Sequence, residues 1–165
     1  MNQQKQKLMV EGIEYIKTND YYEQKLLEEN YDFILDEEYT IDTKDSNKYP
    51  YQYIEIDKSN IEKQFGIDSL NSDVIKKFIK LPRKFVIKTP LGTYNPDWAL
   101  YDDEQVIFVA ETKGTTEKIQ LRYSEDQKIE CGKKHFEAVN KAIKYYQIDT
   151  LKNLLLKKSQ KDNDE

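Results

Sequence analysis

An apolar run from Val106 to Ala110 is the feature that most restricts how this chain can fold. The run is short and rich in β-branched and aromatic residues, which is typical of a buried strand. A polar connector at 102–104 separates it from a second apolar segment that contains Trp98-Ala99-Leu100-Tyr101. The sequence therefore predicts an antiparallel hairpin of two strands, 94–101 and 105–113.

Apolar patterns outside the hairpin predict an α/β fold, with a central mixed sheet flanked by helices. A strand at 84–89 would precede the hairpin and form a three-stranded meander with it. A strand at 145–148 would lie parallel to 105–113 through a right-handed crossover. Further strands are expected at 31–41 and 51–56, and helices at 5–18, from 58 to about 70, at 124–146 and from 151 onward. These patterns divide the chain into an N-terminal extension or connector (1–57), a core (58–156) and a disordered polar tail (157–165).

Composition restricts the class of protein. The single cysteine, Cys131, excludes an internal disulfide and favours a cytoplasmic location. No apolar run approaches membrane-spanning length, so no membrane partner is expected. The net charge is −5, yet residues 76–161 contain 18 Lys or Arg and 11 Asp or Glu. The basic part permits contacts with nucleic acid phosphates, although tight DNA binding by this chain alone is not expected.

Three ionisable residues lie toward the open end of the predicted hairpin. Asp97 precedes Trp98, and Glu111 ends the apolar run, two residues before Lys113. Side chains alternate along a strand, so Glu111 and Lys113 share a face. Two carboxylates on rigid strands suit Mg²⁺, and a lysine beside the ion could orient a water for hydrolysis of a phosphodiester. An Asp97–Lys113 ion pair with Glu111 at the solvent edge is the alternative.

The spacing Pro96-Asp97…Glu111-x-Lys113 resembles the signature of the PD-(D/E)xK nuclease superfamily. The wider sequence, from about residue 58 to 146, resembles the C-terminal endonuclease domain of the restriction subunit of type III restriction enzymes. This resemblance implies a restriction-endonuclease-like fold and a magnesium-dependent DNA endonuclease of a restriction system. The matching residues are Lys80-Leu81-Pro82, Phe85, Thr89-Pro90-x-Gly92-x-Tyr94-Asn95-Pro96-Asp97-Trp98, Glu111-Thr112-Lys113-Gly114, Leu121-Arg122, Glu125, Lys128-Ile129, Cys131-Gly132 and His135-Phe136.

The resemblance also implies roles for individual residues. Asp97, Glu111 and the Thr112 carbonyl would bind one or two Mg²⁺ ions, and Lys113 would position and activate the attacking water. Glu62 would complete the site from the helix that precedes the sheet. A second interpretation of Glu62 is open, because it lies three residues after Ser59, the spacing of a capping box.

Residues after the predicted strand 105–113, in and near the helix predicted at 124–146, have less specific roles. Arg122 and Lys128 are candidate DNA contacts, and solvated helix charges are the equal alternative. His135, the only histidine, lacks a nucleophile or metal ligands at a diagnostic spacing, so a structural role is expected.

The resemblance implies partners besides DNA. The parent would carry an ATP-driven helicase or translocase region upstream and would work with a methyltransferase subunit that reads the recognition site. A phosphate-binding loop is missing from this sequence, so we expect weak or no sequence-specific cleavage by this chain alone. Two alternatives remain, a repair or mobile-element nuclease of the same fold and a non-catalytic docking module.

Overall fold

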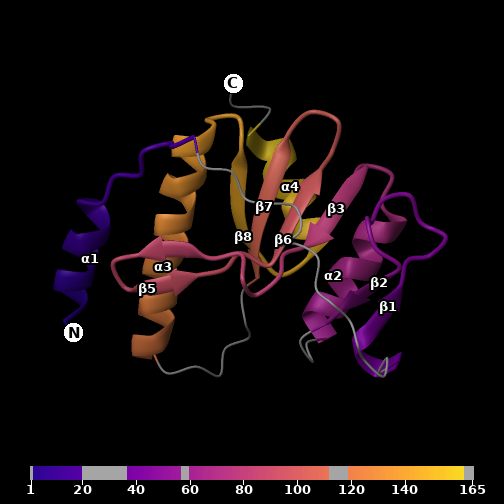
Figure 1. Cartoon of the computed structure of the whole chain (residues 1–165), viewed down its shortest axis with the longest axis horizontal. Helices are drawn as coiled ribbons and strands as arrows, with labels where there is room; N and C mark the ends of the chain where they lie inside the picture. Colours follow the sequence, from indigo (N-terminus) through magenta and orange to yellow (C-terminus); the bar gives the residue numbers. More distant parts are fainter. Residues whose placement is uncertain (1, 20–36, 57–59, 112–118, 162–165) are drawn as a thin grey trace.

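The computed structural model describes residues 2–19, 37–56, 60–111 and 119–161. Its fold is mixed α/β, as predicted, with α1 and α3 toward one side of the central sheet and α2 with the first hairpin toward the other (Figure 1). The elements are α1 (Gln3–Glu11), η2 (Glu37–Tyr39), β1 (Thr40–Asp42), β2 (Tyr53–Glu55), α2 (Asn60–Asn71), β3 (Lys77–Lys80), β4 (Ile87–Thr89), β5 (Gly92–Tyr94), β6 (Trp98–Tyr101), β7 (Val106–Glu111), α3 (Ile119–Val139), β8 (Lys144–Ile148) and α4 (Leu151–Lys161).

The central sheet has four strands in the order β3-β6-β7-β8. The predicted hairpin is confirmed, because β6 and β7 pair antiparallel with Trp98 opposite Val109. The predicted parallel strand is also confirmed, because β8 pairs parallel to β7 and places Ile148 opposite Glu111. Helix α3 supplies the crossover between these two strands, which parallel neighbours require.

The predicted meander was wrong in its first strand. β4 pairs with β5 in a separate two-stranded hairpin, and β3 takes the position beside β6. Gly92 opens β5 with φ +110°, a conformation that favours glycine. Pro96 has no N–H to give to a sheet, so the predicted strand 94–101 is divided into β5 and β6.

Other element boundaries also differ from the prediction. Helix α3 ends at Val139 rather than 146, and the Asn140 side chain accepts a hydrogen bond from the Ala142 N–H at 2.9 Å. This turn lets the chain enter β8 at Lys144. Helix α1 stops at Glu11, and α4 continues through Lys161, past the predicted start of the tail. Of the strand predicted at 31–41, residues 31–36 lie outside the described residues.

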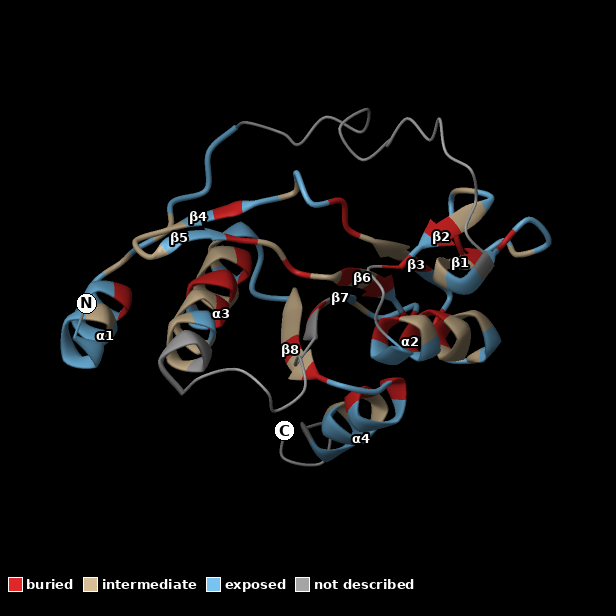
Figure 2. Ribbon diagram, turned by 90° about the horizontal axis from the view of Figure 1, so that it is seen from below, coloured by how far each residue is buried: buried red, intermediate tan, exposed pale blue. Residues whose placement is uncertain are grey.

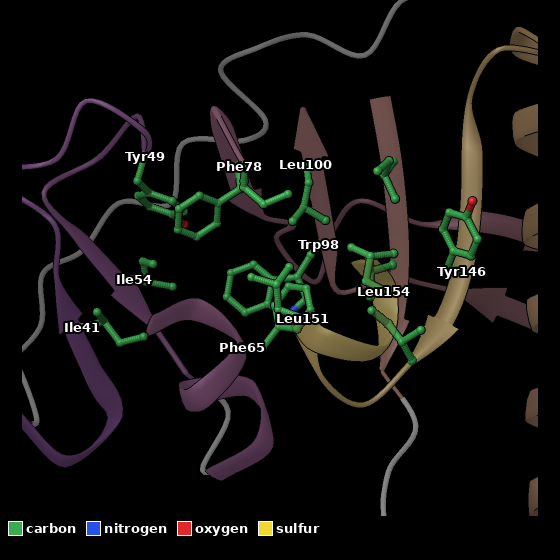
Figure 3. Close-up of a cluster of buried hydrophobic side chains, with 14 of the residues drawn as sticks. Ile41, Tyr49, Ile54, Phe65, Phe78, Trp98, Leu100, Tyr146, Leu151 and Leu154 are labelled. Carbon is green, nitrogen blue, oxygen red and sulfur yellow. The ribbon is translucent and has the colours of Figure 1, made fainter. Parts of the chain in front are cut away.

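One large apolar core lies between the sheet and the elements that cover it (Figure 3). Trp98, only 1% exposed, lies at its centre, and its ring centroid is 5.4 Å from that of Phe65 on α2. Buried residues lie along β6 and also on α2, α3 and α4 (Figure 2). Ile41 of β1 and Ile54 of β2 belong to this core, so the predicted N-terminal extension contributes to it.

A second, smaller core joins the β4–β5 hairpin to α3. Its buried members are Ile87, Tyr94, Ile129 and Phe136. The N-terminal segment is attached to the same region, because Lys134 Nζ donates to the carbonyls of Val10, Glu11 and Ile13 at 2.9–3.2 Å. This core holds Tyr94 in place just before the Asn95-Pro96-Asp97 sequence.

Candidate active site

The backbone of Asp97 connects the two neighbours of β6. Its N–H donates to the Val109 carbonyl at 3.0 Å, and its carbonyl accepts from the Leu81 N–H at 2.8 Å. In a regular antiparallel strand both groups of one residue point to the same neighbour. Trp98 is the register partner of Val109, and the Asp97 N–H donates to the same Val109 carbonyl, so we infer a β-bulge at Asp97, a feature that redirects side chains near active sites. The half-buried Asp97 is thereby fixed between β3 and β7.

The end of β7 brings Glu111 to the same edge of the sheet. Trp98 is opposite Val109, and Glu111 lies two residues beyond Val109 in the direction of Asp97, so both backbones lie at the same end of the β6–β7 pair. The side chain of Glu111, together with Thr112 and Lys113, lies outside the described part of the structure. The structure therefore brings the backbones of two predicted ligands, Asp97 and Glu111, to one sheet edge, and their coordination of a metal stays a prediction. Among the side chains that the structure describes, no group of three or more His, Cys, Asp or Glu forms a metal site.

Glu62 is buried on α2 and faces the sheet. Its side chain is 5% exposed, and its Oε1 lies 3.5 Å from Nζ of Lys80 on β3. Lys80 is the register partner of Trp98 and directly precedes Leu81, which bonds to Asp97. A carboxylate turned toward the sheet fits the predicted role near the metal. The capping alternative depends on Ser59, which lies outside the described residues.

Sequence reasoning did not find the Glu62–Lys80 ion pair. The two residues lie on different elements, so periodicity along one helix or strand does not connect them. The sequence offers one signal, which is that Lys80 stands next to the apolar Leu81-Pro82 rather than in a loop. A lysine at the end of a half-buried strand needs a partner.

Two paired tyrosine hydroxyls are within the electrostatic influence of Asp97. Tyr94 on β5 and Tyr145 on β8 form a hydrogen bond between their hydroxyl groups. Burial raises the pKa of both hydroxyls, and the negative charge of Asp97 raises each pKa further. Both phenols therefore stay protonated at neutral pH and add no negative charge to that of Asp97.

Gly132 of α3 makes room for this tyrosine pair. A Cβ at this position would lie 3.0 Å from Cε1 of Tyr94 and 3.4 Å from the hydroxyl oxygen of Tyr145. Such contacts are closer than normal packing, so a larger residue must displace the rings. The glycine is therefore required by the close approach of helix and hairpin.

We expect Gly132→Ala to lower the free energy of unfolding by about 1–2 kcal/mol. Alanine favours the helix by up to about 1 kcal/mol, so crowding against Tyr94 must exceed this gain. Urea denaturation measures the effect, and Glu137→Ala, at an exposed position of the same helix, is the control. A Gly132→Ala protein as stable as the unmodified chain would contradict the packing described here.

Of the two candidate DNA contacts on α3, the structure describes the side chain of Lys128 but not that of Arg122. Lys128 Nζ lies 3.0 Å from Glu125 Oε1, one turn earlier on the helix. The negative charge of Glu125 also contributes to the raised pKa of Tyr94 on β5. The ion pair does not decide between a DNA contact and a solvated helix charge, so the role of Lys128 stays a prediction. The side chain of Arg122 is outside the described part of α3, and its role stays a prediction.

His135 lies among aromatic rings. Its ring centroid is 5.2 Å from that of Tyr15 and 5.3 Å from that of Phe136, both in edge-to-face geometry. Burial lowers the pKa of His135, so the neutral imidazole is favoured at pH 7. These contacts fit the predicted structural role, and Cys131 nearby is fully buried.

A family model described as an endonuclease domain matches residues 47–151. The chain belongs to this endonuclease domain family. The matched range of the endonuclease domain contains the whole central sheet, both Asp97 and Glu111, and the Glu62–Lys80 pair. The prediction of a restriction-endonuclease-like nuclease is thereby confirmed. No curated protein and no solved structure matches the endonuclease domain significantly. Within the described residues, no helix is long and apolar enough to cross a membrane.

Proposed function

We propose that this endonuclease domain hydrolyses DNA phosphodiester bonds with bound Mg²⁺, as the cleavage domain of a type III restriction enzyme. The observation that supports the proposal most is the β-bulge at Asp97, which fixes the backbone of this residue at the sheet edge where β7 ends with Glu111. The resemblance of the sequence to the restriction subunit of these enzymes supports the narrower assignment.

The residues at this edge have the chemistry that Mg²⁺ prefers. Asp97, Glu111, the Thr112 carbonyl and Glu62 offer hard oxygen atoms, and the ion needs few protein ligands because it keeps several waters. The burial of Glu62 beside Lys80 supports a site with little bulk water. When bound, Mg²⁺ would stabilise negative charge on the phosphate and lower the pKa of a water.

The protein's own residues would then position the reactants. The two backbone hydrogen bonds of Asp97 hold it between β3 and β7, so its carboxylate needs little reorganisation. Lys80 holds the Glu62 carboxylate toward the sheet. In this proposal Lys113 orients the attacking water and contributes positive charge near the phosphate.

Metal binding gives a test that does not depend on cleavage. Isothermal titration calorimetry of the chain with Mg²⁺ or Mn²⁺ should show binding that Asp97→Asn weakens about tenfold or more, since a ligand charge is lost. Asp103→Asn is the matched control, because Asp103 lies in the β6–β7 connector at the opposite end of β6, where it pairs with Lys76 at 3.6 Å. Equal metal affinity in Asp97→Asn and the unmodified chain would refute the proposed site.

The type III assignment carries its own expectations. The partners would be an upstream ATP-driven translocase region and a methyltransferase subunit, and the isolated chain would nick DNA weakly and without sequence preference. A strong preference for branched DNA or DNA ends would instead support a repair or mobile-element nuclease.

A further inference from the structure

Next to the candidate site, all charged side chains of the segment between Asp73 and Asp97 are positive. It contains Lys76, Lys77, Lys80, Arg83, Lys84 and Lys88 and no acidic residue, in a chain whose net charge is −5. Two of these cations lie far from Asp97 along β3, where Lys76 pairs with Asp103 and Lys77 donates to the Asn47 carbonyl. Lys80 pairs with Glu62. The exposed Arg83 and Lys84 are the cations that follow directly after β3.

Arg83 and Lys84 form the tip of a tight turn. The Phe85 N–H donates to the Pro82 carbonyl at 2.8 Å, which closes a four-residue β-turn with these two cations at its central positions. Leu81 and Pro82 are buried on one side of the tip, and Phe85 packs against the second core on the other. The turn therefore presents two exposed charges on a fixed backbone.

Asn95 fastens this turn to the candidate site. Its Nδ2 donates to the Phe85 carbonyl at 2.5 Å and to the Pro82 carbonyl at 3.2 Å, so it contacts both ends of the turn. Asn95 is two residues before Asp97, and Leu81 at the start of the turn donates its N–H to the Asp97 carbonyl. Three hydrogen bonds thus set the distance between the basic tip and Asp97.

We propose that the turn 82–85 binds the DNA phosphate backbone beside the bond that is cleaved at Asp97. This inference rests on the proposed function and adds a substrate-binding surface to it. Arginine and lysine are the residues that neutralise phosphates, and phosphates along one DNA strand recur about every 3.4 Å of helix axis. Two cations held within a few residues of Asp97 can therefore contact phosphates that flank the reacting one.

The test is a DNA-binding measurement without divalent ions. Fluorescence anisotropy of a labelled 30-base-pair duplex is followed against NaCl concentration for the unmodified chain and for Arg83→Gln/Lys84→Gln. The double variant should bind about 10- to 100-fold more weakly at low salt, and the slope of log K against log salt should become shallower by about 1.8, or 0.9 for each lost phosphate contact.

A matched control distinguishes this site from a general effect of charge. Lys76→Gln/Lys77→Gln removes the same charge from the other end of β3, and both residues are exposed. It should change affinity less than about twofold and leave the salt slope within about 0.5 of the unmodified value. Equal losses in the two double variants, or no binding by the unmodified chain, would overturn the proposal.

The measurement also separates this inference from the proposed function. Binding is measured without metal, whereas the proposed function is tested by metal titration of Asp97→Asn. A loss of metal binding in that variant together with normal DNA binding in Arg83→Gln/Lys84→Gln would retain the nuclease and reject the turn as a DNA contact. The reverse pattern would retain the DNA contact and reject the metal site.

Discussion

Replacing Asp97 by Asn is expected to reduce nicking of supercoiled plasmid in Mg²⁺ by about 10³-fold or more, with the fold unchanged. Asparagine has nearly the same shape and keeps both backbone hydrogen bonds, to Val109 and from Leu81, that hold the bulge. What is lost is the negative charge that would attract the metal. The nicking rate at saturating Mg²⁺ and the circular dichroism spectrum together measure the effect.

Two comparisons make this result specific. Asp103→Asn makes the same chemical change at the opposite end of β6 and should nick at the unmodified rate. Lys113→Ala should lose activity to a similar extent if Lys113 orients the water. Continued nicking by Asp97→Asn at more than a tenth of the unmodified rate would mean that cleavage does not use this carboxylate.

Replacing Lys158 by Met is expected to lower the free energy of unfolding at pH 7 by about 3 kcal/mol. Lys158 Nζ lies 2.8 Å from Oδ2 of Asp102, whose side chain is fully buried in the connector between β6 and β7. The other Asp102 oxygen accepts the N–H groups of Glu104 and Gln105 at 3.2 and 3.1 Å. Without the lysine, a buried carboxylate loses its counterion and α4 loses its attachment to the connector. Urea denaturation measures the loss, and Lys152→Met, at an exposed position on the same helix, is the control.

The same pair predicts how the effect depends on pH. Burial by itself raises the pKa of Asp102, but the hydrogen bonds from Lys158, Gln105 and Glu104 outweigh burial and lower this pKa below its usual range. A lowered pKa contributes stability above the unfolded-state value of about 3.9 and loses it as pH falls through the folded-state value. The stability difference between the unmodified chain and Lys158→Met should therefore shrink as pH falls from about 5 to about 2. A difference that stays constant over this range would show that the ion pair is not its source.

The sequence predicted the central hairpin well because its evidence is local. The run from Val106 to Ala110 is continuous and ends in a polar connector, so strand type and pairing follow from neighbouring residues. The partner on the other side of β6 is not a local property. β3 and β4 have similar alternation in the sequence, and the break at Asn95-Pro96 decides that β3 joins the central sheet.

In the candidate site, too, the local features were predicted and the contacts between distant residues were not. Sequence spacing predicted that Asp97 and Glu111 would meet at one sheet edge, and the register of β6 and β7 brings their backbones there. By contrast, the hydrogen bonds from the Asn95 side chain to the carbonyls of Pro82 and Phe85 were not predicted. The accepting residues lie 10 and 13 positions before Asn95, and such a separation matches no helix or strand period. The contact could therefore be found only in the structure.

The presence of Ile41 and Ile54 in the main core has a practical consequence for producing the protein. A truncated version that begins at residue 58 would keep every predicted catalytic residue but would remove this cover from the layer around Trp98 and Phe65. Apolar surface uncovered in this way promotes self-association, so a shortened nuclease would tend to be recovered as aggregate. The sheet edge that contains Asp97 and Glu111 and the first third of the chain therefore have to be made as one polypeptide.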